Sequence, residues 1–193
     1  MTYTTGQIFP VKRICDEARR RGILTIVDGG HTFAQFPFTR DDLGCDFYGT
    51  SLHKWLCAPK GCSFVYARED VQPLLGPLVT SWGWESDHPG PSRFIDWHEW
   101  QGTRDLSPFL AFGAALDFAL SHDLEGVQSR CRALALEARR RVDQLTGLDP
   151  ISPHDDADAS HRWIGQMTAI RLPHDTDVVA LKQRLFDDFR IEV

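Results

Sequence analysis

The stretch IVDGGHTFAQFPFTRDDLGCDFYGTSLHKWLCAPKG, residues 26–61, decides the fold that this sequence predicts. Apolar runs at residues 23–27 and 47–48 are each followed by glycine-containing turns. Short apolar runs bounded by glycines are typical of buried parallel strands. The first run ends at Asp28 and the second leads to Lys54. Because functional groups gather at the carboxyl ends of strands in open α/β sheets, we expect both residues in one crevice.

We expect the acid and the lysine to be buried in this crevice, and such a pair matches what pyridoxal phosphate requires. This cofactor forms a Schiff base with a lysine and sets a carboxylate against its pyridinium nitrogen. Ser51 and His53 lie close to Lys54 in sequence and can donate hydrogen bonds to a phosphate. Taken singly, Asp28 is equally suited to a turn or helix cap, and Lys54 to a solvated surface. Their combination on two strand ends favours the catalytic interpretation.

The stretch resembles the core of the class V aminotransferase family, a group of fold-type I pyridoxal-phosphate enzymes. Asp28-Gly29-Gly30-His31 is similar to the family's Asp-x-x-His element, and Ser51-Leu52-His53-Lys54 to its Ser-x-His-Lys element. The run HKWLCAPKG, residues 53–61, is closest to the branch that contains isopenicillin N epimerase. Leu52 departs from the pattern, since many members have a small residue before this histidine. Because of this departure, residue roles known for the family's cysteine desulfurases transfer less well to this chain than the fold does.

The resemblance implies an α/β fold in two parts. The first is part of the fold-type I large domain, with a mainly parallel sheet flanked by helices, and we assign it to residues 1–122. The second is part of the small C-terminal α+β domain, assigned to residues 123–193. The chain would start after the family's Gly/Thr phosphate loop and ring-stacking aromatic residue, and stop before its carboxylate-binding arginine. We therefore expect an internal fragment, whose active site is incomplete when it stands alone.

The resemblance also implies one catalytic residue and a set of cofactor-binding residues. Lys54 would hold pyridoxal 5'-phosphate as an internal aldimine and then act as the base at the substrate Cα. Asp28 would keep the pyridine nitrogen protonated, with His31 beside the ring. The phosphate would be bound by three further residues: Ser51, His53 and, from the partner subunit of a homodimer, Thr103.

Other residues compete for functional roles. Lys60 is a rival for the Schiff base, but it lies between Pro59 and Gly61 in a turn, where solvent exposure is expected. The acidic run at residues 155–158 lacks the glycine and later glutamate of a calcium loop, so we expect no metal there. Four tryptophans of the loop at residues 76–100 line a substrate cleft or a subunit interface, or only pack the loop: Trp82, Trp84, Trp97 and Trp100.

Composition excludes several other classes of protein. A net charge of −6 offers no basic footprint for nucleic acid, and no apolar run approaches a membrane span. A nucleotide-binding domain is disfavoured because no Gly-x-Gly-x-x-Gly or Walker loop occurs. The odd number of cysteines, five, without a Cys-x-x-Cys pair predicts thiols in a reducing compartment, with Cys57 and Cys62 packed. We expect a cytoplasmic location.

The predicted function is therefore that of a pyridoxal-phosphate enzyme, of transferase, isomerase or lyase type, acting on a small amino acid. The 53–61 run favours an isopenicillin N epimerase-like epimerase or an aminotransferase. The alternative is a cysteine desulfurase or C–S lyase, although residues 76–100 contain no cysteine to act as a mobile nucleophile. A non-catalytic fragment is the second alternative. Reaction type and substrate are left open, because these reactions share their early steps.

Periodicity and capping signals predict the remaining elements. Helices are expected at residues 10–21, 106–120, 124–145 and 177–189, with the third helix presenting a solvated arginine face. Strands are expected at residues 46–48, 62–67, 167–172 and 190–193. A short helical turn is expected at residues 39–44, and a long irregular loop at residues 76–99.

Overall fold

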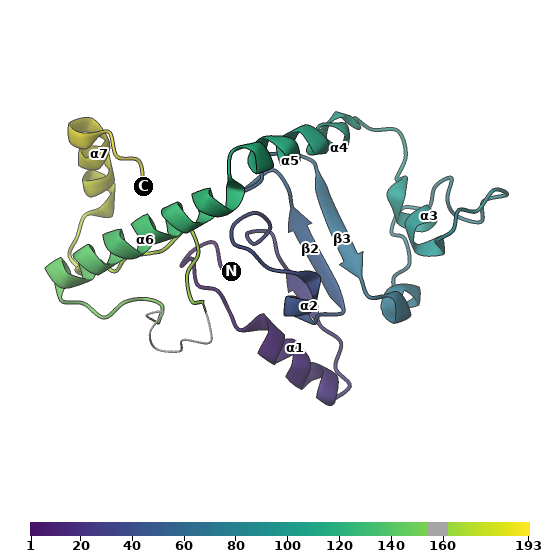
Figure 1. Cartoon of the computed structure of the whole chain (residues 1–193), viewed down its shortest axis with the longest axis horizontal. Helices are drawn as coiled ribbons and strands as arrows, with labels where there is room; N and C mark the ends of the chain where they lie inside the picture. The colour runs from purple at the N-terminus through teal and green to yellow at the C-terminus, as the bar shows by residue number, and fades with distance from the viewer. Residues whose placement is uncertain (154–161) are drawn as a thin grey trace. The chain divides into compact units, whose positions relative to one another are not determined.

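The computed structural model describes residues 1–153 and 162–193, which form two compact units (Figure 1). One unit comprises Met1 and Phe9–Gln128, and the other comprises Thr2–Ile8 and Ser129–Val193. The chain therefore divides a few residues beyond the predicted boundary, and an N-terminal segment joins the second unit. The assignment of these units to large and small domains stays a prediction. The acidic run at residues 155–158 lies outside the described residues.

The first unit is built on a three-stranded sheet whose strands lie in the order β1 (Ile26–Asp28), β2 (Phe47–Ser51), β3 (Ser63–Ala67). β1 and β2 are parallel, with Asp28 opposite Gly49, whereas β2 and β3 are antiparallel. The structure thus confirms an α/β fold, with a mixed sheet in the described residues. Because β1 and β2 are parallel, their carboxyl ends lie at the same edge of the sheet.

β1 is an exposed edge strand, and the prediction of a buried strand was wrong. Ile26 is 81% exposed, and Ile23 and Leu24 are exposed by 56% and 50%. In the part of the chain that the structure describes, β1 pairs with β2 alone. With one strand neighbour instead of two, its apolar side chains gain little cover from the sheet.

The helices at the start of the first unit follow their local signals. α1 (Val11–Arg20) has Pro10 at its N-cap position, and Gly22 follows with a φ of +68°. Glycine suits such left-handed backbone because it has no Cβ. α2 (Arg40–Leu43) starts with a capping box, in which Thr39 and Asp42 satisfy each other's backbone N–H groups.

The second half of this unit is more helical than predicted. η1 (Glu69–Leu74) follows β3, and α3 (Arg93–Glu99) lies inside the stretch expected to be an irregular loop. Ser92 caps α3 by accepting a hydrogen bond from the Ile95 N–H. The helix predicted at residues 106–120 is divided at Ala111 into α4 (Ser107–Leu110) and α5 (Phe112–Ser121).

The core beside the sheet is made of small clusters of buried side chains. The cluster that matters for the site comprises Leu52, Leu56, Ala58 and Cys62, against which α5 packs with Phe112, Ala115, Leu116 and Ala119. The opposite face of α5 stays open, since Phe118 is 61% exposed. Cys62 is packed as predicted. Cys57 is not: it is exposed, at a φ of +60°, where the chain turns back toward the sheet.

The second unit contains most of α6 (Leu124–Thr146), together with α7 (Val178–Phe189), both close to their predicted bounds. The strands expected at residues 167–172 and 190–193 do not form in the structure. Residue Ala169 donates one backbone bond to Thr5 (3.2 Å), and an isolated bridge joins Gln7 to Ile164. Without a continuous partner in the described residues, these stretches lack the ladder that a strand needs.

The predicted solvated arginine face of α6 is wrong at Arg139, and Arg132 is half-buried, with its guanidinium donating to the Ile164 carbonyl at 3.1 Å. Arg140 and Arg141 are exposed and pair with Glu137, as expected. Arg139 is only 2% exposed, and its guanidinium donates to the Ser152 hydroxyl at 3.1 Å, with Asp143 at 3.6 Å. A buried arginine is tolerated here because acceptors surround it. None of the helices that the structure describes has the length and apolar character of a membrane span.

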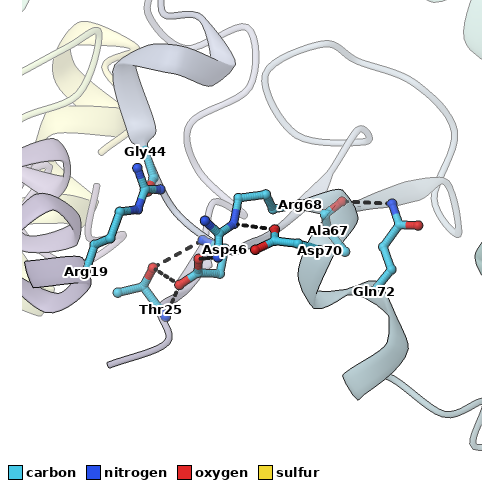
Figure 2. Close-up of polar contacts among 8 residues, drawn as sticks. All are labelled: Arg19, Thr25, Gly44, Asp46, Ala67, Arg68, Asp70 and Gln72. Atoms are coloured by element: carbon cyan, nitrogen blue, oxygen red, sulfur yellow. Dashed lines mark hydrogen bonds and ion pairs between the residues drawn. The ribbon is translucent and has the colours of Figure 1, made fainter. Parts of the chain in front are cut away.

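A buried polar network fixes the start of β2 (Figure 2). Asp46, 4% exposed, accepts hydrogen bonds from the N–H (2.7 Å) and hydroxyl (3.0 Å) of Thr25, which precedes β1. Arg68, just after β3, lies 2.9 Å from Asp46 and 2.9 Å from Asp70. Arg19 of α1 donates to the Gly44 carbonyl at 2.6 Å. One carboxylate thus ties together the chain segments that flank all three strands.

Replacing Asp46 by alanine should lower the free energy of unfolding by about 3 kcal/mol, because Thr25 and Arg68 lose a buried partner. The matched control is Asp70→Ala, which removes the exposed carboxylate from the same arginine and should change stability by less than about 0.5 kcal/mol. Urea unfolding followed by circular dichroism measures both. Equal losses in the two variants would contradict the role given to Asp46.

Candidate active site

The candidate active site begins where β1 ends. Asp28 is the last residue of β1, and its carboxylate accepts a hydrogen bond from the Gly30 N–H at 2.9 Å. The expectation of a buried acid and a buried lysine was wrong, because Asp28 lies on an exposed edge strand and Lys54 is half-buried. The Gly29 N–H donates to the Gly49 carbonyl of β2 at 2.7 Å, which extends the strand pairing by one residue. The turn that carries His31 is therefore attached to β2 and not only to β1.

Lys54 lies in a loop that leaves the end of β2. The Leu52 N–H donates to the Cys62 carbonyl, and the Ala58 N–H donates to the Leu52 carbonyl, both at 3.1 Å. Within the loop, the Cys57 N–H donates to the Lys54 carbonyl at 3.1 Å. Leu52 is 4% exposed. The residue that departs from the family pattern thus anchors the lysine-bearing loop in the core.

Asp28 and Lys54 meet at Gly30. A Cβ added to Gly30 would lie 3.1 Å from Asp28 Oδ1 and 3.3 Å from Lys54 Nζ. Because there is no side chain at Gly30, the carboxylate and the amine can both lie close to this turn. Together they fit the donor set of pyridoxal phosphate, which needs an amine for its aldehyde and a carboxylate for its ring nitrogen.

His31 shares this environment. Burial lowers the pKa of its imidazole below the ordinary value of 6.5, the positive charges of Lys54 and the Met1 amine lower it further, and Asp28 opposes them. Because the pKa is lowered, the neutral imidazole is favoured near neutral pH. His31, Asp28 and Lys54 are thus within electrostatic reach of one another.

The remaining predicted residues are less closely joined. Ser51 is the last residue of β2, opposite Ser63, and His53 is half-buried in the lysine loop. Thr103 is exposed and follows Gly102, whose φ is +101°. Among the described residues, no hydrogen bond links Thr103 to this group. Lys60, the rival lysine, is exposed. The roles of all these residues stay predictions.

Three residues behind the Asp28 turn were not expected from the sequence: Thr32, Tyr48 and Thr50. The hydroxyls of Thr32 and Thr50 each donate to the Gly29 carbonyl at 2.8 Å, and the Tyr48 hydroxyl lies 2.7 Å from that of Thr32. Tyr48 and Thr50 are two positions apart on β2, so they project from the same face of the strand. That spacing is the only signal in the sequence that could have grouped them.

The tryptophans of the 76–100 stretch separate into two groups. Trp84 and Trp97 pack on each other with ring centroids 4.4 Å apart, and the Arg93 guanidinium lies 3.9 Å above Trp97. Trp82 is 84% exposed and Trp100 is 36% exposed. Trp84 is itself 39% exposed. The choice between a substrate cleft, a subunit interface and packing of the loop stays a prediction for all four tryptophans.

The aminotransferase class-V family model matches residues 1–176, and the chain therefore belongs to this family of pyridoxal-phosphate enzymes. It is 43% identical to an isopenicillin N epimerase from Amycolatopsis lactamdurans and 36% identical to one from Streptomyces clavuligerus. Each match covers 98% of this chain and 49% of the relative. The chain thus spans about half the length of these relatives.

The fold is also shared with a solved structure. The apo cysteine desulfurase of Thermococcus onnurineus NA1 superposes with a TM-score of 0.75 at 18% identity, covering 97% of this chain and 46% of that chain. Together these findings confirm the predicted family, the α/β fold class and the cofactor class.

The arrangement predicts how the pKa of His31 responds to its neighbours. Lys54→Met removes a nearby positive charge and should raise this pKa, whereas Asp28→Asn removes a negative charge and should lower it. NMR titration of the imidazole signals measures both, with the exposed His88 as an internal control that should respond to neither. Shifts in the same direction, or no shift, would contradict the proximity of these groups.

The lowered pKa of His31 determines in which direction the free energy of unfolding should change with pH. Below pH 6.5 the unfolded chain takes up a proton on His31 before the folded chain does, so this residue should weaken folding as the pH falls through that window. Above pH 6.5 both states are neutral and the contribution vanishes. Comparing the unfolding free energy of the native sequence with that of His31→Gln at pH 7.5 and pH 5.5 tests this, since the native sequence should lose more.

Proposed function

We propose that this chain supplies the lysine-bearing part of a pyridoxal-phosphate enzyme that acts on an amino acid. The single observation that carries the proposal is the meeting of Asp28 and Lys54 at Gly30, on the adjacent ends of parallel strands. Membership of the aminotransferase class-V family supports it. The activity of a whole enzyme is proposed and not established, because the chain spans about half the length of its relatives.

Each residue of the site has a proposed task. When bound, pyridoxal phosphate supplies an electron-withdrawing ring that stabilises negative charge at the substrate Cα. Lys54 holds the cofactor through its amine and later moves the proton at Cα. Asp28 holds a proton on the ring nitrogen through its carboxylate. His31, neutral near pH 7, offers a hydrogen bond beside the ring without adding charge.

The phosphate of the cofactor is proposed to bind at the lysine loop and across a subunit interface. Ser51 and His53 bring a hydroxyl and an imidazole to the end of β2, within three residues of Lys54. Thr103 is exposed and therefore available to the site of a second copy of the chain. On this proposal the enzyme is a homodimer in the cytoplasm, and Thr103 of each subunit binds the cofactor phosphate in the site of the other subunit.

Among reaction types we favour an isopenicillin N epimerase-like epimerase, with an aminotransferase next. The support comes from the two relatives of 43% and 36% identity, both described as isopenicillin N epimerases. A C–S lyase is the alternative, since a putative L-cysteine desulfhydrase of Oryza sativa subsp. japonica is 28% identical over the whole chain. A desulfurase is disfavoured because residues 76–100 contain no cysteine.

A Lys54-dependent visible absorbance band tests the proposal. Mixing the chain with pyridoxal phosphate should produce a band that Lys54→Ala abolishes, because the Lys54 amine condenses with the aldehyde. Lys60→Ala is the matched control and should keep the band, since that lysine lies in an exposed turn. Borohydride reduction followed by peptide mapping should place the label on Lys54. A label on Lys60, or a band that persists in Lys54→Ala, would contradict the proposal.

Reaction type is decided by following the substrate Cα. An epimerase should exchange the Cα proton of its amino acid in D₂O and invert its configuration, whereas a lyase should release sulfide from cysteine and an aminotransferase should form an oxo acid. Proton NMR with chiral analysis distinguishes the three. A chain that binds the cofactor but does none of these supports the non-catalytic alternative.

A further inference from the structure

We propose that Thr32, Tyr48 and Thr50 act together as positioning residues, which fix the turn at Gly29 and so set Asp28 and His31 relative to Lys54. We call these three residues the hydroxyl bracket. The inference depends on the proposed function, because it assigns the bracket a purpose in presenting the carboxylate and imidazole to a cofactor held by Lys54.

The Gly29 backbone is held at both of its polar groups, the carbonyl by the bracket and the N–H by Gly49. Its carbonyl receives the Thr32 and Thr50 hydroxyls, each at 2.8 Å, and its N–H donates to the Gly49 carbonyl at 2.7 Å. The Thr32 hydroxyl has one hydrogen, which it donates to Gly29. The Tyr48 hydroxyl must therefore donate to Thr32, at 2.7 Å.

Burial makes these bonds hard to replace. Thr32, Tyr48 and Thr50 are exposed by only 7%, 4% and 5%. Water cannot readily substitute for a lost hydroxyl at such positions, so the Gly29 carbonyl would keep only its remaining donors, which include the Thr32 N–H at 2.9 Å. Burial also raises the pKa of the Tyr48 phenol, which keeps its proton available for donation.

Packing restricts the turn as tightly as the hydrogen bonds do. A Cβ added to Gly29 would lie 2.1 Å from Cε2 of Tyr48, so the phenol ring rests directly against this backbone. The ring itself is held by Phe38 and Phe64, with centroids 6.0 Å and 5.9 Å away. The turn is thus clamped between β2 and a fixed aromatic ring.

The neighbours of the clamped peptide are the groups that the cofactor would need. Asp28 precedes Gly29, and the Gly30 N–H donates to the Asp28 carboxylate at 2.9 Å. On its other side, Gly30 faces Lys54 Nζ. A carboxylate must be held within about 0.5 Å of its productive position, and residues supporting it from behind provide this precision. The bracket acts on the site through the Gly29 backbone, so it positions the site and does not take part in the reaction.

The test compares valine and serine at the two threonines. Thr50→Val keeps the shape but removes the hydroxyl, and should weaken binding of pyridoxal phosphate about tenfold. Thr32→Val should do the same, and Thr50→Ser should restore binding close to the native value. Thr39→Val is the control, because it breaks the capping box of α2 without touching the bracket. It should lower stability and leave cofactor affinity unchanged.

A second readout needs no cofactor. In Thr50→Val and Thr32→Val, but not in Thr50→Ser or Thr39→Val, the His31 pKa measured by NMR should move toward 6.5 as the turn loosens. If the native chain alone binds no cofactor, the affinity comparison cannot be made on it, while this titration still decides the bracket. Native cofactor affinity and an unchanged His31 pKa in both valine variants would overturn the inference.

Alanine substitutions at Gly29 and Gly49 test independently whether the Tyr48 ring packs against the turn. Gly29→Ala drives a methyl group into the Tyr48 ring and should lower the free energy of unfolding by about 1–3 kcal/mol. Gly49→Ala, at the neighbouring strand position with open space around it, should cost far less. Thermal unfolding compares the two. Similar costs at both positions would show that the ring does not press on the turn.

Discussion

The parallel pairing of β1 with β2 is the constraint on which the candidate site depends. Its register sets Asp28 opposite Gly49, so the turn after β1 and the loop after β2 leave the sheet side by side. Asp46 secures the other end of the pairing through its bonds to Thr25 and Arg68. A shift of one residue would move Asp28 to the other face of the strand and separate it from Lys54.

Small and large residues around the site have different structural roles. Gly29 and Gly30 keep the turn close to Tyr48 and to Lys54, where no side chain would fit without displacement. Leu52 does the opposite: it fills the core and anchors the lysine loop. The chemistry therefore depends on backbone held by packing. This explains how a chain can depart from its family's pattern at Leu52 without losing the lysine's position.

Local signals predicted local elements well. α1, α2 and α7 begin and end near their expected bounds because proline, capping boxes and glycine act within a few residues. The strand predicted at residues 167–172 does not form, because strands need partners that sequence patterns do not identify. The prediction that Arg139 is solvated was wrong for a related reason: helical periodicity could not reveal that the Ser152 hydroxyl would cover it.

The sequence by itself determined the family and the α/β class, and it predicted which residues are suited to hold pyridoxal phosphate, because these follow from residue types at short, fixed spacings. Only the tertiary structure decided that Asp28 and Lys54 share Gly30, and that hydroxyls from residues 32 and 50 converge on one carbonyl. Those contacts depend on strand register and on ring packing. Both are set by the free energy of the whole folded unit and not by any single stretch.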